Sequence, residues 1–155
     1  MWSFYLKFKE QLSKAQLISL IKGLIKLGYF DETVIFTDSN QYKQQTIADI
    51  EKDLLNNETS TVFIHGLDGG KLRPKHKLYD VLTEIDNTSL KWFDCNQSIY
   101  SVNLRNDRIG FSLDGSADIG MAKEAIELPN FAKFIFEINN LTDNQLINEV
   151  FEDFY

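Results

Sequence analysis

The feature that most constrains the fold is a set of short strand-like runs in the middle of the chain, separated by very short turns. Three runs have the length and β-prone composition of strands: residues 90–95, 98–105 and 108–113. Asn96-Gln97 and Asn106-Asp107, which separate them, are two-residue turn candidates. Such a turn joins antiparallel neighbours, because parallel strands need a long crossover connection. The sequence therefore predicts a sheet that is at least partly antiparallel.

Before these hairpins, strand-like and helix-like stretches alternate. Residues 2–9 alternate apolar and more polar side chains, which predicts a first strand. Ser13-Lys14-Ala15-Gln16 has the form of a capping box and predicts the start of a helix that continues to Leu27. Leucines and isoleucines cover most of the circumference of this helix, so we expect it to be largely buried. Gly28 is suited to the position that follows its last turn.

Similar signals predict the remaining elements. We expect strands at 33–37, 61–64 and 131–138, and helices at 46–56, 79–85 and 121–126. Thr142-Asp143-Asn144-Gln145 is a second capping-box pattern, which predicts a C-terminal helix through residue 154. Five apolar side chains share one face of that helix: Leu146, Ile147, Val150, Phe151 and Phe154.

No Ser/Gly-rich linker, low-complexity tract or internal repeat divides the chain. We therefore interpret residues 1–155 as a single α+β domain. The predicted architecture is a largely antiparallel or mixed sheet packed against a buried N-terminal helix and an amphipathic C-terminal helix.

The net charge of −7 lies entirely in the last third of the chain. Residues 1–108 carry 14 acidic and 14 basic side chains. Residues 109–155 carry nine acidic side chains and two basic ones, Lys123 and Lys133. A one-sided negative field attracts basic partners and repels nucleic acid and anionic membranes.

This asymmetry leads to the first functional hypothesis, a small acidic binding protein that neutralises a basic protein partner. An inhibitor, an antitoxin or an immunity protein acts in this way, and a toxin or nuclease is the kind of partner we expect. An acidic face that serves only solubility is an equal alternative. The predicted partner-binding residues are Asp143, Glu149, Glu152, Asp153 and Tyr155, with Asp114 and Asp118 in second place.

The second hypothesis is a small-molecule-binding domain or enzyme with its site around the loop 65–77. The candidate ligand-binding residues are His65, Asp68, Lys71 and Arg73. The loop does not match a phosphate-binding loop, because three residues separate Gly66 from Gly70 where the motif has four. The basic run 71–77 could contact nucleic acid, but the acidic balance of the chain disfavours a nucleic-acid partner.

Cofactors, metals and membranes are not expected from the sequence. His65 and His76 are the only histidines, and no second cysteine or spaced carboxylate completes a zinc site. Cys95 is the only cysteine, which favours a reducing compartment and hence a cytoplasmic protein. The N-terminus does not have the pattern of a signal peptide, and the longest apolar stretch is too short to span a bilayer. The sequence leaves the oligomeric state open.

Overall fold

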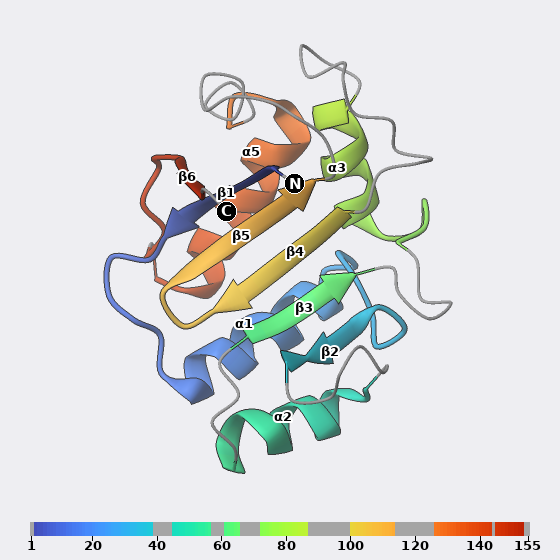
Figure 1. The fold of residues 1–155 in the computed structure, drawn as a ribbon, viewed down its shortest axis with the longest axis vertical. Helices are drawn as coiled ribbons and strands as arrows, with labels where there is room; N and C mark the ends of the chain where they lie inside the picture. Colours follow the sequence, from blue (N-terminus) through green and yellow to red (C-terminus); the bar gives the residue numbers. More distant parts are fainter. Residues whose placement is uncertain are drawn as a thin grey trace.

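Within the part of the chain that the structure describes, six antiparallel strands form one sheet at the centre of the fold (Figure 1). A computed structural model describes residues 2–38, 45–56, 61–65, 72–86, 100–113, 126–143 and 145–153. The strands lie in the order β2-β3-β4-β5-β1-β6. Their bounds are Trp2–Lys7 for β1, Ile35–Thr37 for β2, Thr61–His65 for β3, Tyr100–Arg105 for β4, Arg108–Leu113 for β5 and Phe151–Asp153 for β6.

Helices accompany the sheet on one side. Within the described residues they are α1 (Lys14–Lys26), α2 (Ile47–Asn56), α3 (Lys77–Asp86) and α5 (Pro129–Leu141). In Figure 1 the sheet faces the viewer, and α1 and α5 lie behind it. Helix α1 contacts both α2 and α5, and α3 packs against α5. The fold class is therefore α+β, as predicted.

The core lies between the sheet and these helices. Strand register places alternate residues of the inner strands on the helix side, where they are fully buried: Phe4, Leu6, Val62, Ile64, Val102, Leu104, Ile109 and Phe111. From α1, Leu17, Leu20 and Leu24 enter the same cluster. The predicted capping box is present, since Ser13 Oγ accepts from the Gln16 N–H at 3.1 Å and Gln16 Oε1 accepts from the Ser13 N–H at 2.7 Å. The N-terminal helix is therefore present, but five of its 13 residues are buried, so it is covered along one face and not around most of its circumference.

A buried polar network closes the β2 edge of the sheet. The Gln45 N–H donates to the Ile35 carbonyl oxygen at 3.2 Å, and the Thr37 N–H donates to Gln45 Oε1 at 2.7 Å. Gln45 Nε2 in turn donates to Asp53 Oδ2 of α2 at 2.6 Å. These bonds satisfy backbone groups of the edge strand and fix α2 beside it.

The predicted C-terminal helix is wrong. Phe151–Asp153 forms β6, an edge strand that pairs with β1, and Leu146 makes an isolated bridge with Phe8. Thr142 ends a helix instead of starting one, since it is the C-cap of α5 and its hydroxyl donates to the Ile138 carbonyl oxygen at 2.8 Å. Pairing with β1 decides the conformation of this segment in place of local helical spacing.

The strand predicted at 131–138 is also wrong, because these residues lie within α5. Phe131, Phe134, Ile135 and Ile138 are buried at helical spacing, whereas Phe136 is 64% exposed. The strand predicted at 90–95 and the helix predicted at 121–126 lie almost entirely outside the described residues; Ile126, which is described, is in a turn. The β4–β5 hairpin with Asn106-Asp107 at its turn is confirmed.

Candidate functional site

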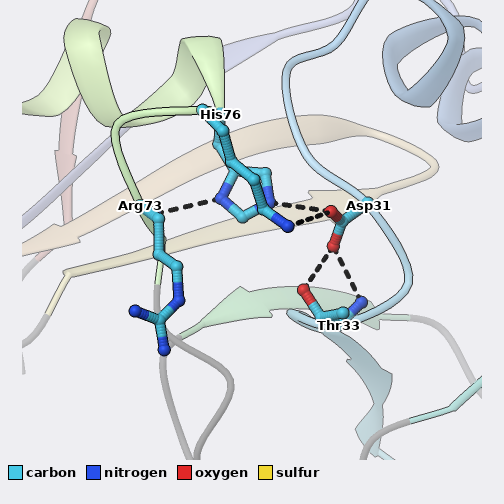
Figure 2. Close-up of polar contacts among 5 residues, drawn as sticks. Asp31, Thr33, Arg73 and His76 are labelled. Carbon is cyan, nitrogen blue, oxygen red and sulfur yellow. Dashed lines mark hydrogen bonds and ion pairs between the residues drawn. The ribbon is translucent and has the colours of Figure 1, made fainter.

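A cluster of polar side chains surrounds the buried His76 (Figure 2). The His76 side chain is 3% exposed. Its Nδ1 accepts from the Arg73 backbone N–H at 3.0 Å, and its Nε2 lies 3.0 Å from Asp31 Oδ2. Because Nδ1 accepts, Nε2 carries the proton and donates to Asp31. The Thr33 N–H donates to Asp31 Oδ1 at 2.9 Å, and its hydroxyl bonds to the same oxygen.

These contacts keep the Asp31 carboxylate charged. Burial of the carboxyl would raise its pKa, but hydrogen bonds from Thr33 and His76 outweigh burial and hold the pKa well below its usual range. Lys75 Nζ lies 3.5 Å from Asp31 Oδ2 and adds a partly exposed ion pair.

The cluster is best explained as a structural connection. Both ring nitrogens of His76 have partners, so neither is available as a general base or metal ligand. The cluster joins the turn after α1 to the start of α3, where the Lys77 and Leu78 N–H groups also donate to the Gly28 and Tyr29 carbonyl oxygens. Within the described residues, no group of three His, Cys, Asp or Glu side chains could hold a metal ion.

The site predicted around the loop 65–77 is only partly within view. His65 ends β3 opposite Ser101, and Arg73 is exposed and supplies a backbone N–H to His76. Asp68 and Lys71 lie outside the described residues. The structure therefore leaves this ligand site as a prediction.

An open pocket of about 440 Å³ lies close to this cluster, between α1, the 31–33 turn and the start of α2. Its lining residues are Lys22, Ile25, Asp31, Glu32, Thr33 and Ile47. Its polar groups are already bonded, since Lys22 pairs with Glu51 at 3.1 Å and Glu32 accepts from the Ile47 N–H at 2.8 Å. A specific small-molecule site needs a few convergent polar groups, and here these groups serve the fold.

The predicted acidic partner-binding residues do not share one helical face. Asp143 and Glu149 are exposed, and Asp143 follows α5 with a left-handed φ of 54°. Glu152 and Asp153 pair with Phe4 and Ser3 in the β1–β6 ladder. Tyr155, Asp114 and Asp118 lie outside the described residues.

The face of the sheet opposite the helices carries aromatic and basic side chains that the sequence analysis did not select. We call it the outer face. Strand register aligns one row across all six strands: Phe151, Tyr5, Gly110, Asn103, Phe63 and Phe36. A second row beside it holds Lys7, Arg108, Arg105 and Thr61. Most of these side chains are partly accessible, while Phe36 and Thr61 are buried.

Rings and cations of the outer face hold one another in place. The Tyr5 and Phe151 rings stack with centroids 5.5 Å apart, and Phe63 stacks on Phe36 at 5.3 Å. The Arg108 guanidinium carbon lies 4.1 Å from the Tyr5 centroid. Lys7 Nζ lies 4.7 Å from the Phe151 centroid. Such cation–π contacts fix long side chains that would otherwise be mobile.

The aromatic and basic character of these strands is visible in the sequence, because Tyr5 and Lys7 occupy the alternate positions of a strand. The rows themselves depend on strand order and register, which the sequence does not reveal.

Comparison of the chain with protein-family models, with curated proteins and with solved structures finds no match. None of the helices in the described part of the chain is long and apolar enough to cross a membrane.

Proposed function

We propose that this protein acts by binding another protein, as an inhibitor, antitoxin or immunity protein does, and that the outer face is its contact surface. The observation that supports the proposal is the set of fixed ring–cation pairs on the sheet face opposite the helices. Tyrosine and arginine are the side chains most enriched among residues that dominate binding energy. Cations already held on rings lose less conformational freedom when a partner binds, which favours affinity.

The proposed setting is the cytoplasm. The single cysteine, Cys95, supports a reducing compartment, because a chain with one cysteine forms no intramolecular disulfide.

An affinity-capture experiment tests the proposal. The tagged wild-type protein and a Tyr5→Ala/Arg108→Ala variant are used as bait in extracts of the native host, and bound proteins are identified by mass spectrometry. The matched control is Phe136→Ala/Lys133→Ala, which removes an exposed ring and an exposed cation from α5. We expect a protein that is retained by wild type and control and lost with the outer-face variant.

The partner is then purified, and its affinity for each variant is measured by calorimetry. Equal affinity for wild type and the outer-face variant would contradict the proposal. Circular dichroism and thermal unfolding of each bait show that a loss of binding does not result from unfolding.

A second candidate function is the one predicted from the sequence, in which the protein binds a basic partner such as a toxin or nuclease. It is favoured by the exposure of Asp143 and Glu149, which make no ion pair with any described residue. In this version, carboxylates of the C-terminal third cover the basic surface of the partner and accelerate encounter. The two candidates require partner surfaces of opposite charge, so charge reversal distinguishes them.

A further inference from the structure

We infer that the segment bound by the outer face is an acidic stretch of protein, whose carboxylates lie along the row Lys7–Arg108–Arg105. This inference rests on the proposed function and specifies the chemistry of the partner. It assigns a locally basic contact surface to a protein whose net charge is −7.

The three cations occupy adjacent positions on three adjacent strands. Lys7 pairs with Arg108 across β1 and β5, and Arg105 and Arg108 flank the Asn106-Asp107 turn of the β4–β5 hairpin. Neighbouring strands are about 4.8 Å apart, so the backbone positions of the row span roughly 10 Å. An extended peptide can place two or three carboxylates over that length.

Among the described residues, two of these cations have donors without a partner, whereas the third, Arg108, donates to the Asp107 carboxylate at 3.2 Å. Arg105 uses Nε to donate to Thr61 Oγ1 at 3.1 Å, and no described residue bonds its two terminal nitrogens. Lys7 lies over the Phe151 ring and makes no ion pair with any described residue. A guanidinium held by its Nε presents its remaining N–H groups in the fork geometry that matches a carboxylate.

Gly110 is the third of the six residues in the row from Phe151 to Phe36. Nothing within the described structure requires a glycine there. Its φ is not positive, and a Cβ at this position would meet its nearest neighbour, the Asn103 side chain, at 3.7 Å. The ladder through Gly110 continues without a bulge on either side. Gly110 is itself buried, so it leaves a position without a side chain between Tyr5 and Asn103 but does not expose its backbone to a partner.

A single-stranded nucleic acid fits this surface less well. Nucleobases bind on open aromatic faces, but here the rings face one another and the cations. Nucleic-acid affinity also depends on many phosphate contacts, and the net charge of the chain opposes them. Protein carboxylates are the better match.

A titration followed by NMR tests the inference. The acidic probe is the peptide acetyl-Glu-Leu-Glu-Leu-Glu-amide, and Lys-Leu-Lys-Leu-Lys with the same end groups is the charge-reversed control. Oligothymidylate is the nucleic-acid probe. The readout is the set of side-chain Nε–H signals of Arg105 and Arg108, together with the Arg73 signal as an internal reference. We expect the acidic peptide alone to shift the Arg105 and Arg108 signals, and the shifts to shrink as salt is added.

A Lys7→Glu/Arg105→Glu variant should bind the acidic peptide about tenfold more weakly, a loss of roughly 1.4 kcal/mol. The matched Lys52→Glu/Lys133→Glu variant reverses two exposed cations on α2 and α5 and should bind as wild type does. Stronger shifts with the basic peptide, or none with the acidic one, would overturn the inference. The proposal that the outer face binds a protein would still hold after that result if binding of the captured partner still required Tyr5 and Arg108. Shifts caused by oligothymidylate alone would overturn both.

Discussion

Two glycines illustrate how much a single residue depends on its place in the fold. Gly28 follows α1 with φ of 87°, a left-handed conformation that side chains with a Cβ adopt at a cost. Gly110 lies in a strand with ordinary backbone angles and room for a Cβ. We expect Gly28→Ala to lower the free energy of unfolding by about 1 kcal/mol and Gly110→Ala to raise it by about 0.5 kcal/mol. Urea unfolding of both variants measures these changes, and effects of the same sign would refute the contrast.

His76 connects two segments through both ring nitrogens, so its loss removes one hydrogen bond from the Arg73 N–H and one from the partly buried Asp31 carboxylate, which keeps its bonds to Thr33. We expect His76→Ala to reduce the free energy of unfolding by about 2 kcal/mol, because the Arg73 N–H and the Asp31 carboxylate lose a hydrogen bond each. Chemical denaturation gives the value. Binding at the outer face should be unchanged, so a variant that stays folded but loses its partner would contradict the structural role of His76.

Asp31 should contribute to the pH dependence of stability. Its pKa is lower in the folded protein than in the unfolded chain, so the charged carboxylate stabilises the folded state. This contribution is fully present above the unfolded pKa, near 4, and is lost as pH falls towards the folded pKa. We expect wild type to lose more stability than Asp31→Asn between pH 5 and pH 2. Thermal unfolding across that interval tests the sign, and parallel curves would exclude the contribution.

At the scale of elements, β6 is a three-residue strand at one edge of the sheet, and it pairs with β1. Phe151 stacks on Tyr5 and lies beneath the Lys7 ammonium group, so it connects β6 to β1. We expect Phe151→Ala to cost about 1 kcal/mol of stability and to increase amide exchange in residues 151–153. Hydrogen exchange followed by NMR measures both effects. Helical chemical shifts for 151–153 in wild type would contradict the strand.

Elements were predictable from sequence where local pattern and tertiary pairing agree. The Ser13 capping box and the Asn106-Asp107 turn are local signals, and the structure contains both the helix and the hairpin. The strand predicted at 131–138 was wrong because one apolar residue changed the apparent spacing of the apolar side chains. Phe136 completed an alternation with Phe134 and Ile138, yet it lies on the exposed side of α5. The Pro129 that begins α5 is the helix signal that this alternation obscured.

The candidate surface was less predictable than the fold. It consists of residues from β1 to β6, and no local pattern in the sequence indicates which of them align across the sheet. Local pattern predicted a C-terminal helix that would carry Glu149, Glu152 and Asp153, whereas Glu152 and Asp153 belong to the strand β6. Register is set by long-range pairing, so the rows of the outer face appear only in three dimensions.

At the scale of the whole molecule, charge and aromatic character are distributed unevenly. The chain carries a net charge of −7, but three cations line one row of the outer face, where Lys7 and Arg108 lie over rings and Arg105 donates to Thr61. The helices bury the opposite face of the same sheet. An acidic partner that matches the local charge of the basic row would therefore bind the outer face. A basic partner attracted by the net negative charge would bind a different surface.

This difference yields a test that compares the two candidate binding modes. Lys7→Glu/Arg105→Glu and Asp143→Lys/Glu149→Lys change the net charge by equal amounts in opposite directions. If the outer face binds an acidic segment, the first variant should slow association with the captured partner about tenfold, and the second should not slow it. Stopped-flow measurements at low and high salt supply the rates, because added salt screens both effects. Slower association with the second variant alone would instead assign the partner surface to Asp143 and Glu149.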